Sequence, residues 1–422
     1  MPQRSMSVSV QGNERRCYNL IMFKRCVLSI LMILLLSACS NAQPSQPESM
    51  LSIAEVDIST SEPTVTPTST ATLQPTASLT PTFTPTFPAT TTSSPTPYGE
   101  FDVGVNPLTG LQVDDPTKLE RRPVMVKVSN WPRSGRPHAG LTSADIVFEY
   151  FIGHQMNRFL AVYYGEDAEV IGPVRSGRLV DAQLVNFYQG ILAYGDADPK
   201  VDGVLFDALG ARALAFLEVP CPPMCGEATH DATGVFTNSA DLTEYAVSNG
   251  IDNATPDLHG MYFQQEPLTG DAAGNLLTVE YADFSIMQWH YDQEAQNYHL
   301  WMEAETTEGL SLAPMIDRNN DQLVIFDNIV VMYADYIEHT SSLHDIILRD
   351  AAAYQPVLLF RDGRMTYGTW RVSEPDRPIL FETTEGGPLA LKPGKTWIVI
   401  VGMHSQTMQS AGGEWEIYFG LP

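Results

Sequence analysis

The chain has 422 residues, with 24 lysines and arginines against 50 aspartates and glutamates, and a formal net charge of −26. A balance this acidic argues against nucleic acid, and against anionic lipid headgroups, as the main partner. Hydrophobic residues make up 44% of the chain, which suits folded domains, and the length predicts more than one of them.

The first 39 residues predict export and a lipid anchor. Lys24 and Arg25 precede the apolar run 27–36, which is followed by Ser37, Ala38 and Cys39. This order is the pattern of a secretory signal, and about ten apolar residues are too few to span a bilayer. The ending resembles a lipobox, so we expect residues 1–38 to be a signal peptide and Cys39 to carry the lipid. An ordinary signal peptide with an incidental cysteine is the alternative.

A tether is expected next, over 39–98. Residues 59–97 contain 15 threonines, 8 prolines and 6 serines, and Glu62 is their single charged side chain. Such a segment has too little apolar surface to fold, and proline keeps it extended at about 3.1 Å per residue. Both an O-glycosylated stalk and an unmodified spacer fit this composition. The folded part is therefore expected outside the cytoplasm, within reach of the membrane that holds the lipid.

Residues 99–255 predict a mixed α/β domain. Runs of β-branched and aromatic residues predict strands at 124–128, 145–151, 159–164 and 191–194. Apolar residues at helical spacing predict helices at 178–189, 201–209 and 241–248. Asp241, with Glu244 three residues later, is the expected N-cap of the last helix.

A linker is expected at 256–274, followed by a β-rich domain over 275–422. Alternating apolar and polar residues predict strands around 287–291 and 298–302. Longer apolar patterns predict strands at 323–332, 357–360 and 365–370, and a closing strand at 397–401. Asp362-Gly363 suits a tight hairpin turn. The expected fold class is therefore α+β, a mixed α/β N-terminal domain followed by a β-rich C-terminal domain.

Two cysteines remain in the folded part, Cys221 and Cys225. An even pair in an oxidising compartment predicts a disulfide. The alternative is a metal site with His230 as a third ligand, but a fourth ligand is not evident. We therefore expect neither a metal ion nor a cofactor.

The segment 118–178 is locally basic inside this acidic chain, with nine basic and six acidic side chains. Arginine forks suit carboxylate and phosphate groups, and backbone N–H groups at a helix start favour anions. The alternative is that these arginines pair internally with Asp145, Glu149 and Asp181. The segment therefore predicts a ligand-binding pocket for an anion, with the candidate residues Arg136, His138, Arg158, Arg175, Ser176 and Arg178.

A hydrolase is the alternative function. Asp145 and Glu149 would share one face of a strand and could act as a carboxylate pair on a glycan. His230 is a further candidate acid or base. The chain lacks a Gly-x-Ser-x-Gly elbow and a His-Glu-x-x-His motif. The expected partners are the membrane, through the lipid, and an anionic wall polymer, a peptide or a small carboxylate.

Eight short motifs occur in order along the folded part of the chain, at 106–111, 122–126, 136–141, 144–149, 158–163, 171–178, 328–331 and 391–397. In this order they resemble the YerB-like lipoprotein family. Two departures stand out: 153–157 replaces a Gly-Gly that family members often carry before Arg-Phe-Leu, and the turn 221–225 looks particular to this chain. The resemblance implies a two-part architecture and a membrane-anchored location, but no activity, because the family is a domain of unknown function.

Overall fold

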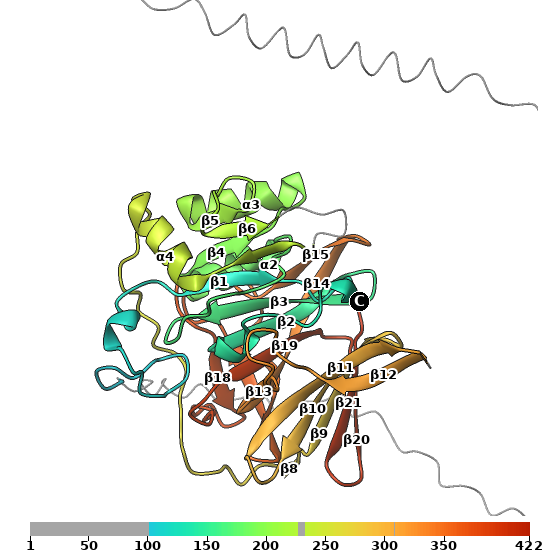
Figure 1. The fold of residues 1–422 in the computed structure, drawn as a ribbon. Helices are drawn as coiled ribbons and strands as arrows, with labels where there is room; N and C mark the ends of the chain where they lie inside the picture. The colour runs from blue at the N-terminus through green and yellow to red at the C-terminus, as the bar shows by residue number, and fades with distance from the viewer. Residues whose placement is uncertain (1–100, 227–232, 308) are drawn as a thin grey trace, which may run out of the picture. The chain divides into compact units, whose positions relative to one another are not determined.

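A twelve-stranded sheet takes strands from both halves of the chain (Figure 1). The computed structural model describes residues 101–226, 233–307 and 309–422. The expected signal peptide, Cys39 and the expected tether therefore lie outside the described residues, as does everything before residue 101. The first half contributes β1 (Val124–Val128), β2 (Ile146–Gly153), β3 (Met156–Tyr163), β4 (Ile191–Tyr194) and β5 (Ala213–Ala215).

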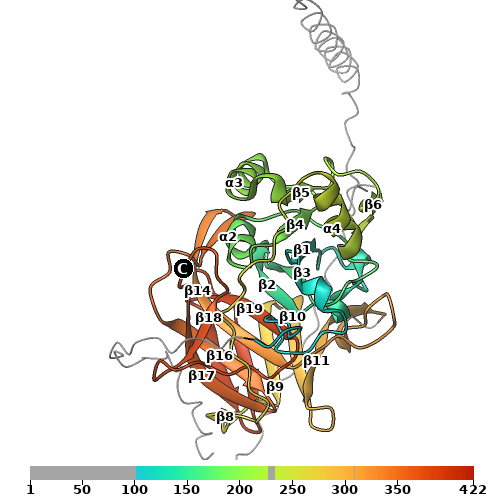
Figure 2. The same ribbon diagram turned by 90° about the vertical axis from the view of Figure 1, so that its left-hand side faces the viewer.

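The second half supplies the other seven strands of this sheet. They are β8 (Ala272–Ala273), β14 (Asn328–Thr340), β15 (Leu343–Ile347), β16 (Gln355–Arg361), β17 (Arg364–Arg371), β18 (Leu380–Thr383) and β19 (Thr396–Gly402). The order of neighbouring strands across the sheet is β18-β17-β16-β14-β19-β2-β3-β1-β4-β5. Figure 2 shows β14, β16, β17 and β18 from the second half. The remaining two strands are side branches, since β15 pairs with β14 and β8 with β17.

The junction between the halves is the parallel pairing of β19 with β2, in which Thr396 lies opposite Ile146 and Ile400 opposite Tyr150. Strands from both sides of the expected linker 256–274 thus form one hydrogen-bonded sheet. Every residue of β1, β2 and β19 is buried, as expected for strands that are covered on both faces. The expected domain bounds at 99–255 and 275–422 stay a prediction.

A second sheet packs on one face of the first. In its strand β10 the apolar side chains of Met287 and Trp289 are fully buried, while Gln288 and His290 are half-buried. The Trp289 ring lies 6.2 Å from the ring of Trp397 on β19, which places the alternating apolar face against the large sheet. Its strands are β9 (Leu276–Ala282), β10 (Ser285–Asp292), β11 (Asn297–Thr306), β12 (Gly309–Pro314), β13 (Ile325–Phe326), β20 (Gln406–Ser410) and β21 (Glu414–Tyr418).

The helix α2 covers the opposite face of the large sheet. Tyr150 of β2 contacts Asp181 of α2, whereas its neighbour Glu149 accepts a hydrogen bond from Trp397 on the other face. The helices are α2 (Leu179–Phe187), α3 (Pro199–Leu209) and α4 (Ser239–Ser248). Short 3₁₀ turns are η1 (Pro116–Leu119), η2 (Arg133–Gly135), η3 (Leu141–Ser143) and η4 (Gly210–Arg212), and a small hairpin pairs β6 (Met224–Gly226) with β7 (Val235–Thr237).

Strand predominates over helix in the described residues, and those after α4 contain no helix. The C-terminal part is therefore β-rich, as expected. The strands predicted at 124–128 and 191–194 have these bounds in the structure. The helix predicted at 241–248 starts earlier, because the side chain of Asn238 accepts from the N–H groups of Ala240 and Asp241. Asp241 as N-cap was therefore wrong.

Two expectations for the second half were also wrong. The strand expected at 323–332 is two strands in different sheets, β13 and β14, which separate at Asp327. Asp327 belongs to neither strand, and its carboxylate accepts a hydrogen bond from the backbone N–H of Lys395 in the loop before β19. The strand at 397–401 does not close the fold, since β19 lies between β14 and β2 and two strands follow it.

Candidate anion-binding site

Three of the expected arginines converge beside the start of α2. Arg158 lies on β3, opposite Tyr150 of β2, and donates a 3.0 Å hydrogen bond to the backbone oxygen of Ser176. Arg175 and Arg178 flank Ser176 in the loop that leads into the helix. Arg178 and Arg175 are the neighbouring charges that most lower the pKa of Arg158, after burial itself. The loop and the strand thus bring three guanidinium groups to one place.

Lys127 of β1 completes the basic cluster, a name kept here for Lys127, Arg158, Arg175 and Arg178. The Lys127 side chain is fully buried, and its Nζ lies 3.2 Å from Asp181 Oδ1. It also forms a hydrogen bond with the Tyr150 hydroxyl, which donates to Asp181. The other oxygen of Asp181 accepts from the backbone N–H of Arg178 at 2.7 Å. The Asp181 carboxylate therefore lies close to Lys127, Arg158 and Arg178.

Burial, together with neighbouring positive charges, lowers the pKa values of Lys127, Arg158 and Arg178. Burial lowers the pKa of Lys127 to about 7, although Asp181 acts in the opposite direction. Burial, followed by the guanidinium groups of Arg178 and Arg175, holds the pKa of Arg158 well below its ordinary value. Burial also lowers the pKa of Arg178. Buried charges are costly unless they are paired, so a cluster with one internal carboxylate is suited to a second anion.

Unused hydrogen-bond donors point to the same chemistry. Arg158 is only 5% exposed, and among the described atoms its Nε has no hydrogen-bond partner. The buried Nε of Arg178 also has none within the described part of the chain. Guanidinium donors in fixed geometry bind the oxygens of carboxylates and phosphates. An anion at the cluster would satisfy these donors and balance their charge.

Sequence reasoning did not assign Lys127, Tyr150 or Asp181 to a ligand site. Lys127 was one of the nine counted cations, and Asp181 was considered only as an internal partner. A signal was present, because Lys127 is the one charged residue of the apolar strand β1. A charged side chain in a strand that is buried on both faces needs a buried partner.

Arg136 lies apart from the basic cluster. Its guanidinium donates 2.7 Å and 2.6 Å hydrogen bonds to the carboxylate and the backbone oxygen of Glu303, on β11 of the second sheet. It also lies over the Trp131 ring, 5.2 Å from its centroid. Arg136 is therefore paired inside the protein, but with Glu303 and not with one of the three acids that the sequence suggested.

The Arg136–Glu303 pair links a loop of the first half to the second sheet, and its loss should reduce stability. We expect Glu303→Gln to lower the free energy of unfolding by about 2 kcal/mol, because a mostly buried guanidinium loses its charged partner. Urea unfolding measures this difference. The matched control is Glu305→Gln, on the same strand but exposed. Equal losses in the two variants would show that the pair adds nothing to stability.

His138 is fully buried and also lies outside the basic cluster. Its ring packs against Phe159, with 5.4 Å between the ring centroids. Burial, and then the charge of Arg136, lowers the pKa of His138 to about 3. The imidazole is therefore neutral at ordinary pH, and it packs like an aromatic core residue.

Asp145 and Glu149 have separate environments. Asp145 accepts from Asn106 and from the N–H groups of Tyr164 and Gly165, and burial raises its pKa to about 6. It lines a pocket of about 240 Å³. Glu149 is fully buried between the two sheets. Glu149 accepts from Asn157 and Trp397, whereas Asp145 has other partners, so these contacts do not form the common site of two carboxylates that the hydrolase alternative requires.

Cys221 and Cys225 form a disulfide in the structure. The metal alternative also needed His230, which lies outside the described residues. Within the described part of the chain, no group of three or more histidine, cysteine or acidic side chains has a geometry that could hold a metal ion.

None of the helices over the described ranges is both long and apolar enough to cross a membrane.

Comparisons with known proteins cover both halves. The "Protein of unknown function (DUF3048) N-terminal domain" matches residues 108–249, and its C-terminal counterpart matches 277–398. The "Putative lipoprotein YerB" of Bacillus subtilis (strain 168) is 28% identical over 312 residues, which cover 70% of this chain and 85% of YerB. The crystal structure of YerB is similar with a TM-score of 0.57 at 26% identity, over 70% of this chain and 96% of that chain.

Proposed function

Because the chain belongs to the YerB-like family, whose domains are described only as of unknown function, we propose a function from the candidate site itself. The protein is a lipoprotein, anchored through Cys39 outside the cytoplasm, that binds an anionic component of the cell envelope at the basic cluster. The lipobox-like ending at Cys39 and the name of the B. subtilis relative support the anchor.

The observation that carries the proposal is the charge balance of the basic cluster. Three basic side chains, Lys127, Arg158 and Arg178, act on the buried carboxylate of Asp181, and the first two are more than nine-tenths buried. Breaking a buried ion pair costs several kcal/mol because an uncompensated charge remains. An external carboxylate or phosphate would reduce the energetic cost of the buried positive charges. Arg175 and Arg178, in the loop before α2, could bind the same anion.

The ligand class follows from the donors. Arginine forks match the flat oxygen pairs of carboxylates and the oxygens of phosphates. A wall polymer with phosphate groups, a wall peptide and a small carboxylate all carry such oxygens. The net charge of the chain, −26, opposes a long polyanion away from the cluster. The contact is therefore local, with one anionic group in the cluster and the rest of the ligand outside.

Substitution of Arg178 tests the proposal. In titrations of the full chain at constant ionic strength, we expect Arg178→Gln to weaken binding of inorganic phosphate by about tenfold or more, since one charged hydrogen bond is lost. The control Arg364→Gln makes the same chemical change at another half-buried arginine that donates only to backbone oxygens. It should leave phosphate binding unchanged.

Purified wall fragments separate binding from hydrolysis. We expect the full chain to co-sediment with the fragments, less so with Arg178→Gln, and to release no soluble product. Product release that Arg178→Gln abolishes would replace binding by hydrolysis as the function. Equal phosphate affinity in Arg178→Gln, Arg364→Gln and the unsubstituted chain would exclude the basic cluster as the anion site.

A further inference from the structure

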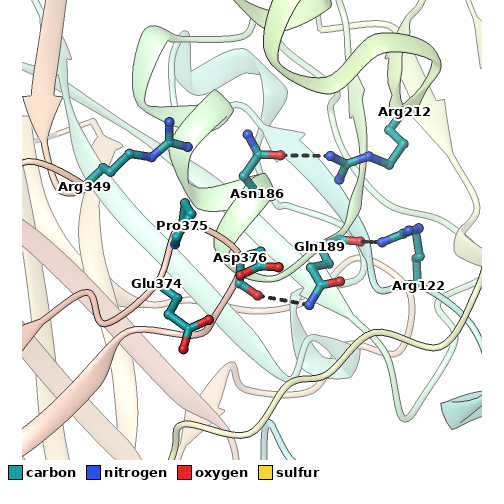
Figure 3. A pocket seen from close by; sticks show the side chains of 8 residues that line it. All are labelled: Arg122, Asn186, Gln189, Arg212, Arg349, Glu374, Pro375 and Asp376. Carbon is teal, nitrogen blue, oxygen red and sulfur yellow. Dashed lines mark hydrogen bonds between the residues drawn. The ribbon is translucent and has the colours of Figure 1, made fainter.

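A separate cavity lies near the C-terminal end of α2, and none of its lining residues belongs to the basic cluster (Figure 3). Its volume is about 520 Å³, within the range of small-molecule sites. Asn186 and Gln189 line it from the first half of the chain. Arg349, just after β15, and the loop 374–376 between β17 and β18 line it from the second half. Both halves thus build this cavity.

Arg212 and Arg349 give the cavity a basic wall. Arg212 donates 2.8 Å hydrogen bonds to the backbone oxygen of Gly190 and to the side chain of Asn186, which are neutral acceptors. Arg349 is exposed. Across the described ranges no acidic side chain lies within ion-pair distance of either guanidinium. Both arginines keep positive charge for an incoming group.

Arg122 differs from these two arginines. It also lines the cavity, but it forms an ion pair with Asp252 and donates a 2.8 Å hydrogen bond to the backbone oxygen of Gln189. Its charge is therefore compensated within the protein. Arg122 lowers the pKa of Arg212, second only to burial, and Asp252 acts in the opposite direction, so Arg212 lies near this ion pair but forms no ion pair of its own among the described residues.

Glu374 and Asp376 give the same cavity an acidic wall. Both are exposed, and no lysine or arginine of the described chain forms an ion pair with either carboxylate. The loop that carries them is fixed to the end of α2, since Gln189 Nε2 donates a 3.0 Å hydrogen bond to the backbone oxygen of Asp376. In Figure 3 the arginines Arg212 and Arg349 stand on either side of Asn186, with the two carboxylates below them.

We propose that this cavity binds a zwitterion of the amino-acid or short-peptide class. Arg212 and Arg349 hold the carboxylate of the ligand, and Glu374 and Asp376 face its ammonium group. A simple anion would meet two carboxylates and a simple cation would meet two guanidiniums, so the mixed wall selects a molecule that carries both charges. This site is independent of the anion at the basic cluster.

Calorimetric titration of the full chain with three alanine dipeptides tests the proposal. Ala-Ala carries both charges, N-acetyl-Ala-Ala lacks the ammonium group, and Ala-Ala amide lacks the carboxylate. We expect Ala-Ala to bind at least about tenfold more tightly than either capped form, because each loses one set of charged hydrogen bonds. Equal binding of the three peptides, or no saturable binding of Ala-Ala at millimolar concentrations, would overturn the proposal.

Two variants test which side chains bind the carboxylate of the ligand and which bind its ammonium group. Arg349→Gln should weaken Ala-Ala by about tenfold and remove its advantage over the amide, while the double variant Glu374→Gln/Asp376→Asn should remove its advantage over the acetylated form. All three residues are exposed, so folding should be preserved. Arg364→Gln again serves as the control. Retention of both preferences in both variants would exclude these side chains as the ligand's partners.

Discussion

Replacement of Asp181 by asparagine is expected to make the protein less stable and its anion binding tighter. The variant removes the one carboxylate inside the basic cluster, so the free energy of unfolding in phosphate-free buffer should fall by about 3 kcal/mol. This decrease in the free energy of unfolding lies at the lower end of the range for a broken buried ion pair. The reason is that Lys127, whose pKa is about 7, can release its proton when its partner is removed. The carboxylate no longer repels the ligand, so phosphate should bind about tenfold more tightly.

Opposite signs for stability and affinity distinguish a binding site from a purely structural cluster. Denaturant unfolding with and without phosphate, at constant ionic strength, measures both quantities in one series. Asp207→Asn is the matched control, since it makes the same change on an exposed face of α3 and should alter neither. A stability loss in Asp181→Asn without tighter phosphate binding would mean that the cluster is structural and has no external ligand.

The sequence indicated the arginines of the cluster but not their geometry. Arg175, Ser176 and Arg178 lie in one loop, so their proximity follows from spacing alone. Arg158 joins them only because the β2–β3 hairpin sets it opposite Tyr150, and the register depends on the turn at His154 and Gln155, which both have positive φ. The chain departs from the family's Gly-Gly pattern at that turn, so the register could not be taken from the motif.

Pairings between distant segments were beyond prediction. Arg136 lies in the same basic segment as the cluster, yet its partner Glu303 is 167 residues away, and no periodicity links the two. For the same reason the apolar patterns of β2 and β19 predicted two strands but not that they are parallel neighbours. Local patterns specify that a strand exists, whereas the order of strands depends on contacts between both halves of the chain.

The sheet that joins the halves also explains why the second cavity was not foreseen. Arg212 and Arg349 are 137 residues apart in the sequence, and each lies outside the arginine-rich segment 118–178. They line one cavity because β15 pairs with β14, next to β19, while α2 packs against β15 through the hydrogen bond from Gln183 to the backbone oxygen of Ile346. A count of charges along the sequence reveals a segment that is rich in arginine. It cannot reveal two isolated arginines that become neighbours only in the folded chain.

Glu149 is expected to make the free energy of unfolding fall as the pH rises. Burial raises the pKa of its carboxyl to about 7, against the hydrogen bonds from Asn157 and Trp397, which act to lower it. The folded state therefore holds this proton more tightly than the unfolded chain does. The stabilisation is complete below the unfolded pKa, near 4.5, and is lost as the pH rises through about 7. At pH 8 the cost should approach about 3 kcal/mol.

Glu149→Gln should remove this pH dependence, since an amide does not titrate. In urea unfolding, the stability of Glu149→Gln relative to the unsubstituted chain should improve by about 3 kcal/mol between pH 5 and pH 8. The variant loses one acceptor for Asn157 or Trp397, but that loss is the same at both pH values and cancels in the comparison. The exposed Glu305→Gln should keep the pH dependence of the unsubstituted chain. An unchanged pH dependence in Glu149→Gln would show that this carboxylate is charged between the sheets, with its compensation in the surrounding donors.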